Sequence, residues 1–133
     1  YRLGKLGIAP SPVDMDDVFL YHKTTRRATY DEARAACPDC DEVLLWNARR
    51  EMTEATVSNL VVERDGRLVT PPVSSGLLPG TLRAKLLAEG RIEEAVVLLD
   101  DLPHVTRLWL INGVRGWVQA PLSALPCIHA ETK

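Results

Sequence analysis

The chain has 133 residues, of which 46% are hydrophobic and 26% charged, with a formal net charge of −2 at pH 7. This predicts one soluble domain over residues 1–133, able to bury about two thirds of its unfolded surface. The balanced charge argues against a nucleic-acid partner and no apolar run reaches the roughly 18 residues of a membrane span, so a cytoplasmic enzyme or enzyme fragment is expected.

In the first half of the chain, strand patterns flank one helical pattern. A loose strand pattern over residues 2–8 and a short extended run over 18–21 precede a predicted helix over 25–36. A strand is predicted over 42–47, and Glu54 is expected to lie between this strand and the next. This half therefore predicts strands on either side of one helix.

The second half begins with a predicted β-hairpin over residues 57–70, because Asp65-Gly66 is a tight-turn signal between two apolar runs. A helix is predicted over 80–88, closed by Gly90. The remaining elements are a mixed segment, a helical turn and two strands, over residues 92–99, 102–104, 106–111 and 116–119. The expected fold class is therefore mixed α/β (α+β), with a mixed or antiparallel sheet packed with helices.

Cysteines are few, and two of them form the motif Cys37-Pro38-Asp39-Cys40. This CxxC spacing suits zinc or thiol exchange, but zinc would need two more ligands and Cys127 has only His129 close by. A thioredoxin-type motif opens a helix after a strand, whereas this pair follows a predicted helix. Two loop thiols are the favoured interpretation, and no metal site is predicted.

An amine and a carboxylate are the first two candidate site residues. Lys23 follows the apolar run and is the candidate nucleophile, provided that burial or the nearby Arg26 and Arg27 lower its pKa. Glu54 could hold the proton on a pyridinium nitrogen, and Asn59 could bridge the site to the backbone. Alone, the lysine would be a solvated charge and the glutamate an exposed turn residue.

Backbone donors come from a helix start and from a turn. Gly80-Thr81-Leu82 opens the second helix, and free N–H groups there are suited to a phosphate. Asn112-Gly113 could place an amide and an N–H group at a cleft, and Arg115 could bind a substrate carboxylate. The alternatives are an ordinary glycine helix start and a hairpin turn with a surface arginine. Together, the amine, the anion and the phosphate donors are the parts that hold pyridoxal phosphate (PLP).

These motifs resemble the class IV (fold-type IV) PLP-dependent aminotransferases. The matching segments cover nearly all of residues 1–120, and the form of the family that they most resemble is the aminodeoxychorismate lyase module fused behind a synthase component. They are His22-Lys23-Thr24-Thr25-Arg26-Arg27, Thr53-Glu54 with Asn59-Leu60, Leu78-Pro79-Gly80-Thr81-Leu82-Arg83, and Leu110-Ile111-Asn112-Gly113-Val114-Arg115. The resemblance implies the large, cofactor-binding domain of that fold.

The resemblance also assigns roles. It implies that Lys23 bonds the cofactor aldehyde and moves the substrate Cα proton, and that Glu54 pairs with the ring nitrogen. The N–H groups of Thr81 and Leu82 would bind the phosphate, with Asn112 and Gly113 facing phosphate and substrate. Branched-chain members tend to carry a tyrosine five residues after the lysine, where this chain has Ala28. This difference favours a lyase that converts aminodeoxychorismate to 4-aminobenzoate and pyruvate.

Two alternatives stay open beside the lyase. An aminotransferase of the branched-chain or D-amino-acid type would use the same residues, and a catalytically silent domain would follow if half of the pocket is absent. Family members have an N-terminal lobe, and too few residues precede Lys23 to form it. We therefore expect a C-terminal domain that lacks its N-terminal lobe or fused synthase, binds a small-molecule substrate and self-associates, for example as a homodimer.

Overall fold

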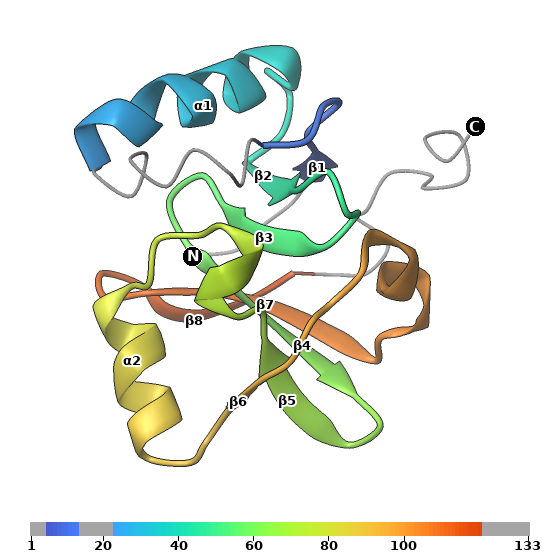
Figure 1. Ribbon diagram of the computed structural model, residues 1–133, viewed down its shortest axis with the longest axis vertical. Helices are drawn as coiled ribbons and strands as arrows, with labels where there is room; N and C mark the ends of the chain where they lie inside the picture. Colours follow the sequence, from blue (N-terminus) through green and yellow to red (C-terminus); the bar gives the residue numbers. More distant parts are fainter. Residues whose placement is uncertain (1–4, 14–22, 121–133) are drawn as a thin grey trace.

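A curled sheet with two α-helices forms the framework of the computed structural model, which describes residues 5–13 and 23–120, the side chains of 23–29 excepted (Figure 1). The helices are α1 (Lys23–Ala36) and α2 (Thr81–Ala88), and short 3-10 segments cover Val73–Ser75 and Leu99–His104. The strands are β1 (Leu6–Ile8), β2 (Glu42–Trp46), β3 (Met52–Ala55), β4 (Asn59–Arg64), β5 (Arg67–Thr70), β6 (Glu93–Glu94), β7 (Arg107–Asn112) and β8 (Gly116–Ala120). This arrangement confirms the predicted mixed fold class.

Strand β4 is the centre of the sheet. β3 pairs with its first residue through Glu54 and Asn59, β5 pairs with its last three residues, and β7 runs antiparallel to it over residues 59–63. The pairs β1–β2 and β5–β6 are parallel, while the other pairs of strands are antiparallel. The predicted mixed sheet is therefore confirmed, and three strands meet where β4 begins.

Local turn chemistry explains two predicted boundaries. Asp65 and Gly66 both have positive φ angles, 55° and 77°, as a two-residue hairpin turn between β4 and β5 requires. Gly90 has φ 71°, and behind it the N–H of Arg91 bonds to the carbonyl of Leu86 at 3.0 Å, which closes α2 in a glycine-dependent cap. The predicted hairpin and helix end are both confirmed.

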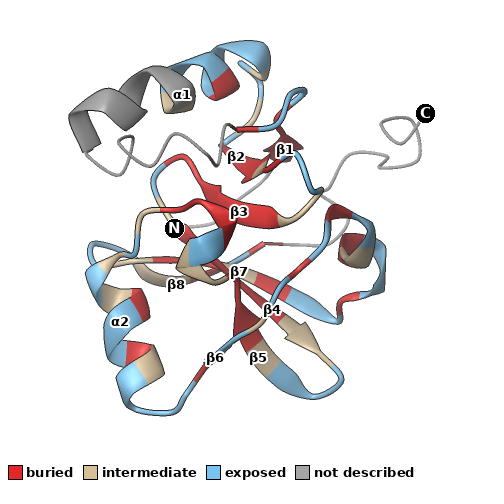
Figure 2. Cartoon of the chain, in the orientation of Figure 1, coloured by how far each residue is buried: buried red, intermediate tan, exposed pale blue. Residues whose placement is uncertain are grey.

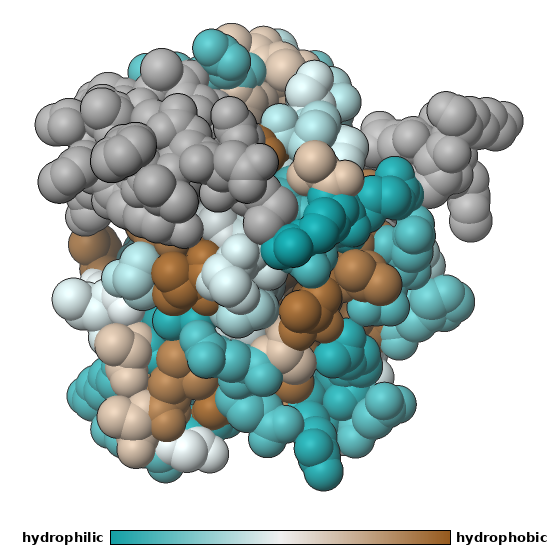
Figure 3. Space-filling model, viewed as in Figure 1, coloured by the Kyte–Doolittle hydropathy of each residue, from teal (hydrophilic) through white to brown (hydrophobic). Residues whose placement is uncertain are grey.

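The strands bury alternate side chains on opposite faces. On β2, Val43 and Leu45 pack with Ala33 of α1, while Leu44 enters the largest apolar cluster. On β4, Val61 packs against α2, whereas its neighbours join that largest cluster. Figure 2 shows the buried residues concentrated in the sheet, and Figure 3 shows apolar and polar side chains interspersed on the viewed face. Each helix thus covers its own part of the sheet.

Some of the predicted boundaries differ from the structure. Glu54 lies within β3 and not between strands, because its short strand pairs with β4 although two of its four residues are polar. The segment 92–99 holds only the two-residue β6, and α1 begins at Lys23, two residues before its predicted start. The predicted run over 18–21 lies outside the described residues. None of the helices that the structure describes is long and apolar enough to cross a membrane.

Candidate cofactor site

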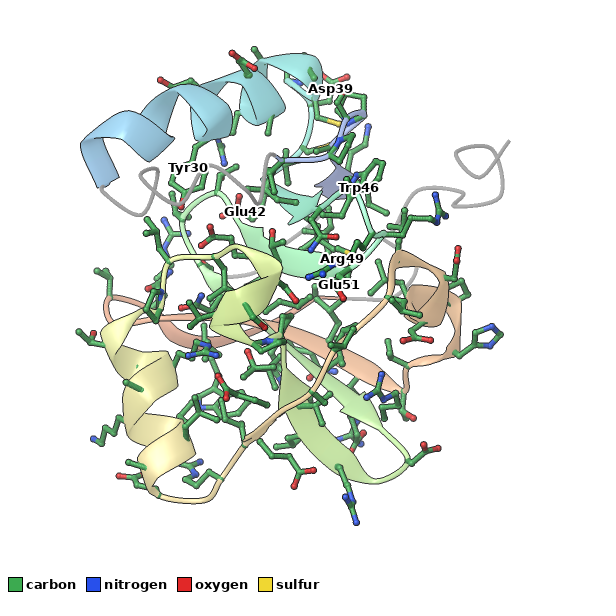
Figure 4. All side chains as sticks on the ribbon, in the orientation of Figure 1. Tyr30, Asp39, Glu42, Trp46, Arg49 and Glu51 are labelled. Carbon is green, nitrogen blue, oxygen red and sulfur yellow. The ribbon has the colours of Figure 1, made fainter. Side chains whose placement is uncertain are left out.

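A hydrogen bond joins α1 to the carboxylate of β3. The Tyr30 hydroxyl donates to Oε2 of Glu54 over 2.9 Å, and Figure 4 shows the Tyr30 side chain on the side of α1 that faces the sheet. Lys23 is the first residue of α1, and its side chain lies outside the described part of the chain. The hydrogen bond from Tyr30 therefore ties the helix that begins at Lys23 to the predicted carboxylate.

Glu54 is a buried carboxylate, with an exposed fraction of 4%. Its Oε2 atom also accepts a hydrogen bond from the backbone N–H of Leu78 over 3.4 Å. Burying an ionised carboxylate is costly unless hydrogen bonds or a cation compensate for the lost water. These two donors approach the same oxygen, so they restrain the orientation of the carboxylate.

Asn59 holds the loop that leads into α2. Its Nδ2 atom donates to the carbonyl of Leu78 over 3.0 Å, and its Oδ1 atom accepts from the N–H of Gly80 over 3.0 Å. A Cβ atom on Gly80 would lie 2.6 Å from Oδ1 of Asn59, so a larger residue would push the loop away. The amide of Asn59 thus fixes this loop to the first residue of β4.

Replacing Asn59 with alanine is expected to lower the free energy of unfolding by about 1–3 kcal/mol. The change leaves the half-buried carbonyl of Leu78 and the N–H of Gly80 without the partner that Asn59 provides. Urea unfolding of the purified chain measures it, with Gln119→Ala as the control because Gln119 is an exposed amide on β8. Equal losses in the two variants would contradict the anchoring role of Asn59.

The start of α2 is suited to an anion. Gly80 is its N-cap and provides no side-chain cap, so the N–H groups of the first turn are not covered by a capping side chain. The turn after β7 reaches the same place, since a Cβ atom on Gly113 would lie 3.4 Å from Oγ1 of Thr81. The structure therefore brings Gly80, Thr81 and Gly113 together, and free N–H groups at a helix start are suited to a phosphate.

Asn112 closes the turn between β7 and β8. Its Oδ1 atom accepts from the N–H groups of Val114 and Arg115 over 2.9 and 2.8 Å, and its Nδ2 atom donates to Oγ of Ser58 over 3.0 Å. The structure thus uses this amide to join two turns. A shallow hollow lies beside it, lined by Glu42, Val57, Ser58, Leu110, Asn112, Arg115 and Val118.

Glu42 is a buried polar residue that sequence reasoning missed. Its Oε1 atom accepts from the N–H of Thr56 over 3.1 Å and from Nη1 of Arg34 over 3.4 Å, and the Thr56 hydroxyl contacts the same oxygen. Figure 4 shows Glu42 at the start of β2, between α1 and the sheet. An acidic residue before an apolar strand resembles an ordinary exposed strand end, so the sequence carries no signal for this role.

A second polar cluster supports the loop before α2. Asn47 is buried and donates through Nδ2 to the carbonyl of Ser75 over 2.8 Å and to Oε1 of Glu51 over 2.9 Å. The Ser75 hydroxyl donates to the same oxygen over 3.1 Å. The hydrogen bond from Asn47, followed by that from Ser75, lowers the pKa of Glu51 against the effect of burial. Both ends of the loop 75–80 are therefore fixed by asparagine side chains.

Three kinds of comparison agree on the family. The family model "Amino-transferase class IV" matches residues 2–121. A Schizosaccharomyces pombe protein, provisionally named an aminodeoxychorismate lyase, is 37% identical over 71% of this chain and 44% of its own length. The aminodeoxychorismate lyase of Saccharomyces cerevisiae is 30% identical over 76% of this chain and 32% of its own length. The chain therefore spans less than half the length of either relative.

A solved structure extends this likeness to the fold. The crystal structure of a Mesorhizobium loti protein, provisionally named an amino-acid aminotransferase, is similar with a TM-score of 0.84 and 41% identity. The match covers 94% of this chain and 60% of that chain. The names of these relatives thus include both a lyase and an aminotransferase.

Proposed function

Since this chain belongs to the class IV aminotransferase family, whose members depend on PLP, we propose that it is the cofactor-bearing part of an aminodeoxychorismate lyase. Lys23 is the proposed catalytic residue. The proposed cofactor contacts are Lys23, Glu54, Asn59, Gly80, Thr81, Leu82, Asn112 and Gly113, and Arg115 is the proposed substrate contact.

One observation carries this proposal: a buried carboxylate and an uncapped helix start are joined by one short loop. Leu78 donates to Glu54, and two residues later Gly80 begins the turn into α2. PLP needs an anion beside its ring nitrogen and hydrogen-bond donors for its phosphate. The carboxylate of Glu54 fits the first need, and the N–H groups at the start of α2 fit the second.

The protein side of the chemistry follows from these positions. PLP, when bound, supplies an electron sink for the pair left behind when a Cα proton is removed. Glu54 keeps the ring nitrogen positively charged, which a neutral partner would not do. The N–H groups of Thr81 and Leu82 bind the phosphate and set the position of the ring. Lys23 removes the Cα proton, and Arg115 orients the substrate carboxylate.

Product analysis separates the lyase from the aminotransferase. A lyase acting on aminodeoxychorismate releases 4-aminobenzoate and pyruvate without an added keto acid, whereas an aminotransferase consumes an amino donor and a keto acid together. The two yeast relatives named as lyases favour the first outcome, and the Mesorhizobium loti structure favours the second. Keto-acid-dependent amino transfer with no 4-aminobenzoate would replace the proposed lyase by the aminotransferase.

The proposed setting is a longer protein. The chain spans only part of its relatives, and we propose that an N-terminal lobe or fused synthase supplies the opposite wall of the pocket. Val57 and Val114, exposed by 62% and 93%, lie in the β3–β4 and β7–β8 turns and offer apolar contacts to such a lobe or to a second copy. The 133-residue chain alone is expected to turn over slowly and to self-associate. Sedimentation across concentrations tests the association, and a strictly monomeric chain contradicts it.

We expect Tyr30 to act as a positioning residue for Glu54. In Tyr30→Phe the ring stays and the hydroxyl that donates to Oε2 of Glu54 is lost. PLP affinity should fall about threefold to tenfold, in keeping with the net contribution of one ordinary hydrogen bond, because the hydroxyl acts on PLP only through Glu54. Fluorescence titration with PLP measures the affinity of both forms of the chain.

A double-mutant cycle provides the control for Tyr30. In a Glu54→Gln background, Tyr30→Phe should have little further effect on PLP affinity, since the charged acceptor is already gone. Additive losses would assign Tyr30 a purely structural role in packing α1.

A further inference from the structure

The turn that ends α1 brings two cysteines to one place. The N–H of Cys40 bonds to the carbonyl of Cys37 over 3.1 Å, which closes a β-turn. The ends of such a turn have Cα atoms less than about 7 Å apart. Disulfides span Cα separations of about 4.4–6.8 Å, so the backbone here already has the span that a disulfide between these residues needs.

The two sulfur atoms meet above Gly7 of β1. A Cβ atom on Gly7 would lie 2.7 Å from Sγ of Cys37 and 2.6 Å from Sγ of Cys40, so both thiols flank one point. Both cysteines are half-buried, which leaves them within reach of a small solute. The absence of a side chain on Gly7 provides the space that both sulfur atoms occupy.

The turn is fixed to the sheet beside it. The N–H of Asp41 donates to the carbonyl of Lys5 over 2.8 Å, and the N–H of Lys5 donates to Oδ2 of Asp41 over 3.0 Å. Figure 4 shows this turn, marked by Asp39, beside the end of α1. The two thiols are therefore held near each other by the fold in addition to their closeness in sequence. Among the described residues no third His, Cys, Asp or Glu joins them to complete a metal site.

We propose that Cys37 and Cys40 are a reversible dithiol–disulfide pair that reacts with small disulfides such as oxidised glutathione. The thiolate of Cys37 attacks one sulfur of the small disulfide, and the other half leaves as a thiol after taking up a proton. Cys40 then attacks the Cys37 sulfur and releases the second half as a thiol. The two cysteines lose two electrons and two protons, and the small disulfide gains them.

The order of attack follows from the surroundings of Cys40. Burial, and next its hydrogen bond to Cys37, raise the pKa of Cys40 to about 11. A thiol that is hardly ionised at neutral pH is a poor first nucleophile, so Cys37 reacts first. The second step is intramolecular and proceeds because the sulfur atoms are already neighbours. This pair acts independently of the proposed cofactor site.

The test is oxidation of the folded chain by oxidised glutathione, followed by mass spectrometry of the intact chain and its peptides. All variants carry Cys127→Ser, so that only the pair reacts. The folded chain should lose the mass of two hydrogen atoms, and reduction should restore it. Cys40→Ser should stop as a glutathione adduct on Cys37, and Cys37→Ser should react more slowly. Ring closure in the folded chain should be about tenfold faster than in the same chain in urea.

Three results would overturn the proposal. In the first, the folded chain with both Cys37 and Cys40 stops as a glutathione adduct. In the second, this pair does not react with oxidised glutathione. In the third, ring closure is no faster in the folded chain than in urea. Gly7→Ala provides a matched geometric check, because its Cβ atom must push the sulfur atoms aside. Ring closure should slow in this variant, and an unchanged rate would show that the packing above β1 does not position the thiols.

Discussion

Replacing Lys23 with alanine is expected to abolish the attachment of PLP that borohydride makes permanent. Borohydride reduces the bond between a lysine amine and the cofactor aldehyde, so the chain gains mass at that lysine. Peptide mass spectrometry after reduction measures the modified residue directly, without any need for turnover. The wild-type chain should carry the label on the peptide that contains Lys23, and Lys23→Ala should carry at most background label.

Lys85→Ala is the matched control, because Lys85 lies on the exposed side of α2 and should leave the labelling unchanged. Equal labelling of the wild type and Lys23→Ala would refute the proposed role of Lys23. If the chain alone takes up no label, the same comparison is made in a longer protein that includes the proposed N-terminal lobe. Label on Lys23 in that protein supports the assignment, and absence of label from Lys23 rejects it.

Replacing Glu54 with glutamine is expected to weaken PLP binding about tenfold to a hundredfold, as losing a charged hydrogen-bond partner does. Glutamine keeps the shape and accepts the hydrogen bonds from Tyr30 and Leu78, but it lacks the charge that holds a proton on the ring nitrogen. Turnover should fall further than affinity, because the protonated ring is the stronger electron sink. Fluorescence titration measures the affinity, and product release in an active, longer form of the protein measures the rate.

Glu63→Gln is the control for this charge, since Glu63 lies on neighbouring β4 and pairs with Arg107 near the surface. It should leave PLP affinity within a factor of about two, as a weak surface ion pair predicts. An affinity loss as large in Glu63→Gln as in Glu54→Gln would mean that overall charge, and not the place of Glu54, controls binding.

Short sequence patterns predicted the turn and the helix end whose conformation is set by the residues at those positions. Asp65-Gly66 and Gly90 predicted a turn and a helix end because these residues adopt positive φ angles, which the structure confirms. The strand that holds Glu54 was missed because its pairing with Asn59 on β4 makes a short, polar segment extended. Pairing between strands is a property of the whole fold, which no window of sequence contains.

The candidate site also contains residues that sequence motifs identify and residues whose role depends on long-range packing. Motif spacing identified Glu54, Asn59 and Gly80, and the structure brings them to one loop. Tyr30 and Glu42 were missed as partners because their importance depends on what α1 and β2 lie against after folding. A tyrosine in a helix and a glutamate before a strand are usually surface residues, so their sequence positions alone carry no such information.

If β4 paired in the wrong register, the proposed cofactor site would be lost as well, because both depend on the first residue of β4. Asn59 lies opposite both Glu54 and Ile111, while its side chain holds the loop that begins α2. A slip of one residue would turn this amide, and every apolar side chain of β4, to the opposite face. A chain with mispaired strands therefore has no proposed cofactor site. Under the proposed function PLP would bind only correctly folded chains, and by mass action it would enrich them during folding.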